Sequence, residues 1–282
     1  MVEPLSEKNQ TETHAEVKHE SPLYAESVFE LGGFNVTNSF ISSFLVVMIV
    51  VVFGVSLRGR IRLIPRGLQN ILEMIIESLL DLFDTVTHSR QKTLLFAPLV
   101  LSLFFFILIN NWLGLLPGVG TIGKIVSEHG EAVFVPFFRG GTADLNTTLA
   151  LAIIGVFMSH VLGVLAVGWW HYFNKFINLK AFLEIAGKIR KDPTIILVNP
   201  IKAFVGLIEI IGEMAKVASL SFRLFGNIFA GEVLLVSMSA IMAFVVPIPF
   251  MFLELIVGLI QAFIFAILIL TYLSINTTKE SH

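Results

Sequence analysis

The stretch SLSFRLFGNIFAGE, residues 219–232, places an arginine, Arg223, inside an apolar segment that extends from 203 to 246. A membrane crossing needs only about 20 apolar residues, and 44 residues in one helix would extend about 66 Å. The segment therefore predicts either two spans with Arg223 near a loop or one long, steeply tilted helix. A guanidinium keeps its proton at physiological pH, so the function must require a charge at this position.

The composition of the whole chain is that of an integral membrane protein. Of its 282 residues, 55% are hydrophobic and only 14% are charged, and the mean hydropathy is +0.85. The chain has no cysteine, which excludes thiolate catalysis, disulfides and cysteine-based metal sites. The sequence predicts no cofactor, no metal site and no nucleic-acid partner, and it lacks a P-loop for nucleotide binding.

Four other apolar runs, at 40–57, 94–116, 147–170 and 250–275, are long enough to span a bilayer. With 203–246 they predict an all-α membrane fold with about five membrane-embedded helices, the last two long and tilted. Residues 66–91 predict one amphipathic helix at the interface, because their apolar residues recur at steps of three and four. The acidic stripe of this helix (Glu73, Glu77, Asp81 and Asp84) is either a solvated face or a docking face for a basic helix.

The distribution of basic residues predicts how the chain is oriented. The stretch 58–92 carries six basic residues and 171–202 is also rich in lysine, whereas 117–146 has only Lys124 and Arg139. Basic loops stay in the cytoplasm, so the N-terminus is expected outside and the C-terminus inside. We expect three regions, namely a polar external tail (1–33), a membrane domain (34–276) and a short cytoplasmic tail (277–282).

Charged residues are rare between 203 and 275, and intramembrane charges are functional candidates by default. The six are Glu209, Glu213, Lys216, Arg223, Glu232 and Glu254. On one helix, Glu209 would lie about 21 Å before Arg223 and Glu232 about 13 Å after it. Two acids on opposite sides of a fixed cation predict two proton entry points separated by a barrier. A carboxylate from a partner could pass that barrier, because its pKa falls beside the cation.

Several stretches together resemble subunit a of the F-type ATP synthase, the stationary half of a rotary motor. Besides SLSFRLFGNIFAGE they are NNWLGLLP (110–117), TADLNTTLALA (142–152) and LIQAFIFAILILTYLS (259–274), within a similarity that covers about 35–275. The resemblance implies that Arg223 faces a rotating c-ring and its carboxylates. It also implies that Gln261 is the neighbour of Arg223 on the last helix, and Asn227 falls on the Arg223 stripe.

The same resemblance implies two half-channels for ions. The outer one contains Glu232 and Glu254 and is bordered by Asn111, Asp144 and Asn146, while the cytoplasmic one contains Glu209 and Ser219. The best-known bacterial relatives carry histidine where this chain has Glu254. Two carboxylates on one path could suit a proton relay or could admit Na⁺, so the transported cation stays open.

Simpler interpretations exist for several of these residues. Asp144 could cap the helix that begins near 147, and Glu213 with Lys216 could make a helix-stabilising contact instead of lining a channel. His160, in mid-span, is expected to be a hydrogen-bonded packing residue. Arg223 could be a snorkelling or structural arginine, and Glu232 and Glu254 could be structural.

The resemblance implies an ion-translocating (proton-translocating) stator subunit of the F0 motor that is no enzyme by itself. Its expected partners are the c-ring, the peripheral-stalk b subunits, the rest of the F1F0 complex and membrane lipid, in a bacterial inner membrane. The alternative is a self-contained ion-coupled transporter, which would need a midplane substrate site and usually repeated halves. An intramembrane enzyme would need a nucleophile–base pair, and none is evident.

Overall fold

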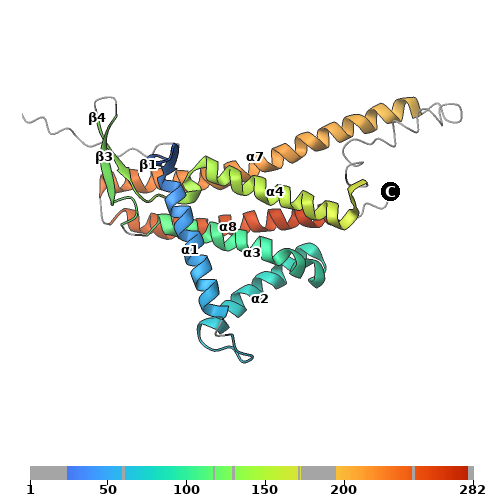
Figure 1. The fold of residues 1–282 in the computed structure, drawn as a ribbon, viewed down its shortest axis with the longest axis horizontal. Helices are drawn as coiled ribbons and strands as arrows, with labels where there is room; N and C mark the ends of the chain where they lie inside the picture. Colours follow the sequence, from blue (N-terminus) through green and yellow to red (C-terminus); the bar gives the residue numbers. More distant parts are fainter. Residues whose placement is uncertain are drawn as a thin grey trace, which may run out of the picture.

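The structure, a computed structural model, describes residues 24–58, 61–116, 118–128, 131–170, 172, 195–242 and 245–278. Its helices are α1 (Asn38–Arg58), α2 (Leu68–Thr87), α3 (Arg90–Gly114), η1 (Gly141–Ala143), α4 (Leu145–Val167), α7 (Ile195–Ile241) and α8 (Pro247–Thr277). Five of these, namely α1, α3, α4, α8 and the Phe204–Ile241 part of α7, are long and apolar enough to cross a membrane. The predicted helical membrane fold is confirmed (Figure 1).

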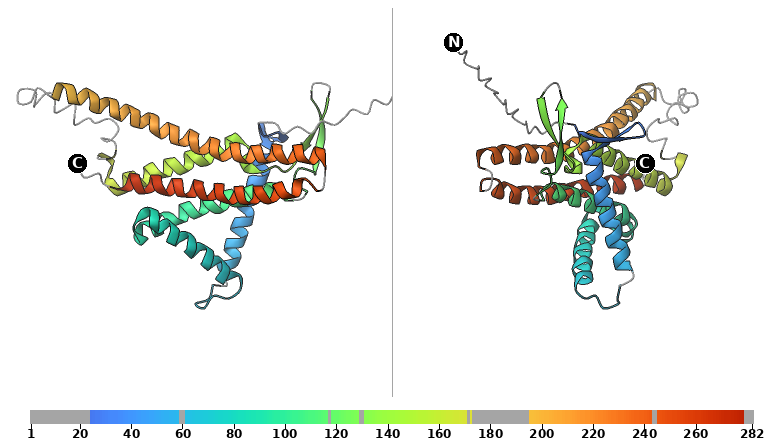
Figure 2. Two further views of the ribbon diagram at one scale, coloured as in Figure 1. Left: turned by 180° about the vertical axis from the view of Figure 1, so that it is seen from behind. Right: turned by 60° about the vertical axis from the view of Figure 1, so that its left-hand side comes forward.

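The long apolar segment around Arg223 is a single helix. Helix α7 has 47 residues and α8 has 31, so Arg223 lies within α7 and not near a loop. Proline has no backbone N–H to donate, and Pro247 fits the first position of α8 for this reason. Helix α1 crosses α7 and α8 at a large angle in both figures, so the three cannot all stand perpendicular to one membrane (Figures 1 and 2). A membrane crossed by α1 requires the long pair to be tilted, as predicted.

The core lies where α3, α4, α7 and α8 meet, and Phe83 of α2 is also buried in it. Its fully buried side chains include Phe96, Ile107, Leu224 and Phe265. Two glycines of α4 let α8 approach closely. A Cβ at Gly155 would lie 2.4 Å from Ile269 Cδ1, and one at Gly163 would lie 2.9 Å from the Asn276 carbonyl oxygen. Small residues at such crossings are typical of membrane helices.

Helix α2 forms the amphipathic element predicted for 66–91 and packs against α3 and α8. Two of its four acids are neutralised within the chain, because Arg90 Nη1 lies 3.0 Å from Asp81 Oδ1 and 2.9 Å from Asp84 Oδ2. Glu73 accepts a hydrogen bond from Gln69 at 2.8 Å. Part of the acidic stripe therefore joins α2 to α3 through ion pairs.

Two antiparallel hairpins, β1–β2 (Ser27–Leu31 and Phe34–Thr37) and β3–β4 (Gly123–Glu128 and Glu131–Pro136), were not predicted. Strand β1 lies in the stretch expected to be a polar tail, and β3–β4 lies in the expected loop 117–146. Lys124 Nζ joins the two hairpins by donating to the Val28 carbonyl at 2.6 Å. Strands this short leave little alternation in the sequence to be recognised.

The bundle has two distinct ends (Figure 1). We call the end with β3–β4, η1 and the turn between α7 and α8 the β-hairpin end. The opposite end, where α4 and α8 finish, is the C-terminal end. The basic segment 171–202, on which the predicted orientation partly depends, lies outside the described residues apart from Tyr172 and the backbone of the first residues of α7.

Candidate functional site

Arg223 lies on an exposed face of α7. Its neighbours on this face are small or polar, because Ala215, Ser219, Gly226 and Ala230 are also exposed. Leu220 and Leu224 of the same helix are buried in the core, whereas Phe222, next to Arg223 in the chain, is exposed. Within the described part of the chain, Arg223 forms no ion pair. A permanent cation in a membrane-spanning helix is thus left without a counter-charge from the described residues.

The pairing of α7 with α8 is set one turn beyond Arg223. Asn227 Nδ2 donates to Gln261 Oε1 at 2.7 Å, which places Gln261 of α8 beside the Arg223 face. Gln261 is 2% exposed, and its Nε2 has no hydrogen-bond partner among the described residues. Buried polar groups are nearly always paired, so this free donor marks a place where a further acceptor would fit.

Glu232 is held by a buried arginine. Nε and Nη2 of Arg139 donate to the same Glu232 oxygen, Oε2, at 3.1 and 3.0 Å. The Arg139 side chain is only 4% exposed and also donates to the Tyr24 carbonyl, while its backbone N–H donates to Ser42 Oγ. The guanidinium thus ties α7 to the β-hairpin end, and Glu232 is its counter-ion.

Glu254 of α8 has no such partner. It is 7% exposed, its carboxylate lies against the backbone of Gly231, and its Oε1 accepts no hydrogen bond within the described residues. One turn further along α8, Asn111 Nδ2 donates to the Gly258 carbonyl at 2.9 Å, and Thr142 Oγ1 donates to Asn111 Oδ1 at 2.6 Å. The structure therefore brings Glu254 and Asn111 to neighbouring positions along α8.

Asp144 is the N-cap of α4. Its side chain accepts from the Asn146 backbone N–H and from Thr147 Oγ1, both at 3.3 Å. Asn146 is exposed on the first turn of α4 and donates its amide to Asp144. The capping interpretation of Asp144 matches this geometry, and its second predicted role as a channel border stays a prediction.

A second polar cluster lies toward the C-terminal end, between α4 and α7. Glu213 accepts from Lys216 at 2.7 Å and lies 3.4 Å from His160 Nε2, while the other ring nitrogen of His160 bonds to the Tyr172 hydroxyl. Burial and the charges of Glu213 and Glu209 raise the pKa of Tyr172 to about 12, so this phenol stays protonated at physiological pH. Of the residues predicted here, Glu209 adjoins the cluster, whereas Ser219 lies on the exposed Arg223 face.

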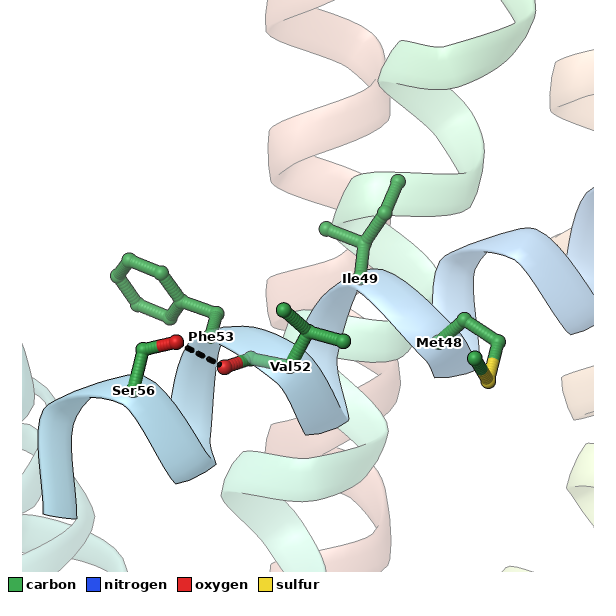
Figure 3. A pocket seen from close by; sticks show the side chains of 5 residues that line it. All are labelled: Met48, Ile49, Val52, Phe53 and Ser56. Atoms are coloured by element: carbon green, nitrogen blue, oxygen red, sulfur yellow. Dashed lines mark hydrogen bonds between the residues drawn. The ribbon is translucent and has the colours of Figure 1, made fainter.

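An open pocket on α1 lies apart from all of these groups (Figure 3). It is lined by Met48, Ile49, Val52, Phe53 and Ser56. Its one hydroxyl, on Ser56, donates to the Val52 carbonyl at 2.7 Å. An apolar surface of this kind on a membrane-spanning helix suits lipid and offers no chemistry.

The sequence does not predict the partners of the acids. Its pattern marks Arg139 only as a charge for the orientation and His160 only as packing, and it singles out neither Thr142 nor Tyr172. Thr142 lies 31 residues from its partner Asn111, and Arg139 lies 115 residues from Tyr24. The partner of His160, Glu213, is on another helix, so the spacing of these residues in the sequence does not reveal the contacts. Within the described residues no group of three or more histidines and acids could hold a metal ion.

Comparison with known proteins decides the family. The family model of the ATP synthase A chain matches residues 40–274, which include Arg223 and nearly all of the five spanning helices. The chain belongs to the ATP synthase A chain family. ATP synthase subunit a of Syntrophobacter fumaroxidans is 32% identical over 231 residues, 82% of this chain and 80% of that protein.

Other members of the ATP synthase A chain family match to a similar extent. Subunit a of Campylobacter jejuni subsp. doylei is 31% identical over 84% of this chain and 88% of its own length, and that of Geobacter sulfurreducens is 29% identical over 85% and 87%. The resemblance found in the sequence is thereby confirmed across the membrane domain.

Proposed function

We propose that this chain is the ion-translocating stator of a rotary ATP synthase and that Arg223 faces a ring of partner subunits that carry carboxylates. The observation that carries the proposal is the exposed guanidinium of Arg223 on a spanning helix, which forms no ion pair with any residue that the structure describes. Charged groups are costly in a bilayer unless paired, and the small residues around Arg223 leave room for a close partner helix. A carboxylate on a partner subunit would supply the counter-charge of Arg223. It would also explain why the Arg223 side chain is exposed on the surface of this chain.

The geometry suits a gate. A protonated ring carboxyl is neutral and can turn through lipid, and it loses its proton on reaching Arg223, because a nearby cation lowers the pKa of an acid. A free proton cannot pass the same permanent charge. The exposed Asn227, which is oriented by its hydrogen bond to Gln261, provides a polar contact for the arriving carboxylate.

Ions enter and leave through two offset half-channels in this proposal. The one at the β-hairpin end is external and uses Glu254, with Asn111 and Asn146 at its border and Glu232 in its wall. The one at the C-terminal end is cytoplasmic and includes Glu209 and Ser219. Because the Arg139 guanidinium places a permanent positive charge beside Glu232, it repels a second cation at this acid, which favours H⁺ over Na⁺ as the transported ion.

The coupling must be rotary on energetic grounds. One charge moved across 100 mV yields about 2.3 kcal/mol, far below the cost of making ATP, so several ions must be summed mechanically. The nucleotide chemistry then belongs to the other subunits, and peripheral-stalk b subunits hold this chain against the turning ring. The complex lies in a bacterial inner membrane, with the N-terminus outside and the C-terminus in the cytoplasm.

Two experiments test the proposal against a self-contained transporter. In the complete complex, Arg223→Ala should abolish ATP-driven proton pumping and ATP synthesis while assembly persists, and Arg62→Ala, at an exposed arginine outside the spans, should leave both intact. Normal coupled turnover with Arg223→Ala would contradict the role. In liposomes, the chain alone should conduct no ions unless the ring is added, whereas a self-contained transporter would work without it.

A further inference from the structure

The cluster of His160, Tyr172, Glu213 and Lys216 bridges α4 and α7 on the C-terminal side of Arg223. Glu213 precedes Arg223 by ten residues, or about 15 Å along the helix axis. The Glu213 side chain is 13% exposed, and those of His160 and Lys216 are 25% and 29% exposed. The cluster thus lies inside the protein, between Arg223 and the end of the bundle.

We infer that His160 and Glu213 form a proton-exchange pair of the half-channel at the C-terminal end, with Tyr172 and Lys216 as positioning groups. This inference rests on the proposed function and names residues for a path that otherwise contains only Glu209 and Ser219. It assigns to His160 a role beyond the packing that the sequence suggested.

The first argument is that both nitrogens of the His160 ring face groups that can exchange protons. Nδ1 bonds to the Tyr172 hydroxyl, and Nε2 lies 3.4 Å from Glu213 Oε2. An imidazole can bind a proton at one nitrogen and release a proton from the other, and it does so near neutral pH. In the step we propose, a proton passes from Glu213 to Nε2 while the Nδ1 proton leaves through the Tyr172 hydroxyl, and the reverse step runs during pumping.

The second argument is an acceptor that lacks a hydrogen bond. Glu213 Oε1 is bound by Lys216 at 2.7 Å, which alone would make a sufficient structural contact within α7. Oε2 is buried and accepts no hydrogen bond among the described residues, and the group that faces it is the His160 ring. Because no hydrogen bond from the described residues occupies this oxygen, it can exchange a proton directly with the imidazole that faces it.

The third argument is the direction set by the surrounding charges. Lys216 Nζ lies 5.0 Å from the centre of the Tyr272 ring, and that phenol is within range of the charges of both Arg223 and Glu213. Among the residues that the structure describes, the charged and titratable groups that face the pair are Glu209 and Lys216 of α7, Tyr272 of α8 and Tyr172. Lys216 and Arg223 both follow Glu213 in α7, on the side away from the C-terminal end. Their charges therefore repel a proton on His160 toward the C-terminal end.

Tyr172 is the member of the cluster that receives the proton on the way to the C-terminal end. It is 5% exposed, and burial with the charges of Glu213 and Glu209 keeps its hydroxyl protonated, because its pKa is raised to about 12. A hydroxyl in this state can donate one proton and accept another in a single relay step. It cannot itself hold a charge on the path.

The test uses inverted membrane vesicles that contain the complete complex, with the pH of the medium varied from below to above neutral. We expect His160→Gln and Glu213→Gln each to lower ATP-driven pumping by about 100-fold, the lower end of what a positioned acid–base group contributes. We also expect both to remove the part of the pH dependence that falls near neutral pH, and Tyr172→Phe to shift it. Ser159→Ala, one residue away in α4 and bonded to Asn276 on another face, is the matched control.

The outcomes separate this inference from the proposed function. Wild-type rate and pH profile in His160→Gln would overturn the inference, and so would equal losses in His160→Gln and Ser159→Ala with an unchanged profile. Arg223→Ala is measured in the same vesicles. If it abolishes pumping while His160→Gln has no effect, the inference fails and the stator function stands; if Arg223→Ala also pumps normally, the stator function itself fails.

Discussion

The two ends of α7 each carry a glutamate bound to basic groups, but the two arrangements differ in kind. At the β-hairpin end, Glu232 is bound by Arg139, a 4% exposed guanidinium that keeps its charge and reaches across from a loop. At the C-terminal end, Glu213 is bound by Lys216 of its own helix and faces His160, whose imidazole can bind or release a proton at either ring nitrogen.

In the proposed function the difference separates a structural acid from an exchanging one. Neutralising Glu232 would leave Arg139 buried without its counter-ion, so we propose that Glu254, whose Oε1 is free of hydrogen bonds within the described residues, exchanges protons at this end. At the other end the same helix carries Glu213, whose Oε2 accepts no hydrogen bond from the described residues. The following changes break or sharpen this contrast.

The largest effect is expected from Glu232→Leu. It leaves the Arg139 guanidinium buried without a counter-ion, which costs about 3–5 kcal/mol in comparable pairs. We expect poor assembly and a lower thermal midpoint of the purified complex. The double variant Arg139→Met with Glu232→Leu should recover most of the loss, because an apolar pair of similar size is often tolerated. A Glu232→Leu complex as stable as the wild type would show that the pair is not structural.

Glu254→Gln should assemble normally and lower proton conduction by about tenfold, because a positioned proton acceptor is removed while water remains on the path. Glu254→His should conduct better than Glu254→Gln. Since an imidazole in water binds its proton about two pH units above a carboxyl, the external pH for half-maximal conduction should rise in Glu254→His. Both are read from conduction against external pH, and an unchanged profile in both would remove Glu254 from the path.

Gly231→Ala tests the position of Glu254 without changing any charge. A Cβ at Gly231 would lie 2.2 Å from the Glu254 carboxylate, so the carboxylate must move aside, whereas a Cβ at Gly212 of the same helix would meet nothing within 4 Å. We expect conduction to be several-fold lower in Gly231→Ala, within the range that a misplaced acid–base group costs. Conduction in Gly212→Ala should equal that of the wild type. Equal conduction in the two variants would show that the place of this carboxylate does not matter.

The smallest effect is expected at Asp144. Loss of the N-cap in Asp144→Ala should lower stability by about 1 kcal/mol, and Asp144→Asn, which keeps the cap, should cost little. Conduction in Asp144→Asn then separates the two predicted roles. Wild-type conduction leaves Asp144 as a cap alone, and a clear loss would place its charge on the ion path.

The sequence predicted the fold well where long apolar runs decide it. The spans, the amphipathic helix and the family followed from composition, periodicity and motifs. The segment 203–246 stayed ambiguous because its length fits two short helices as well as one long tilted one, and Pro247 marks a break without showing where the turn lies.

The site was predicted less completely, because its contacts join distant parts of the chain. The Asn227–Gln261 bond depends on the exact turn between α7 and α8, and a shift of a few residues would remove it. Arg139 lies 93 residues before Glu232, and His160 lies on a different helix from Glu213. Charge and spacing identify the acids, but only tertiary packing shows which of them is already paired.

The central claim, that Arg223 faces a carboxylate-bearing ring, is tested most directly by cross-linking. The chain has no cysteine, so single cysteines can be placed at Ser219 and Ala230 on the Arg223 face and at Phe157 on an exposed face of α4. In the intact complex, each is paired with a cysteine beside the ring carboxylate and oxidised. The account predicts disulfides to the ring from Ser219→Cys and Ala230→Cys and none from Phe157→Cys; ring disulfides from Phe157→Cys alone would contradict it.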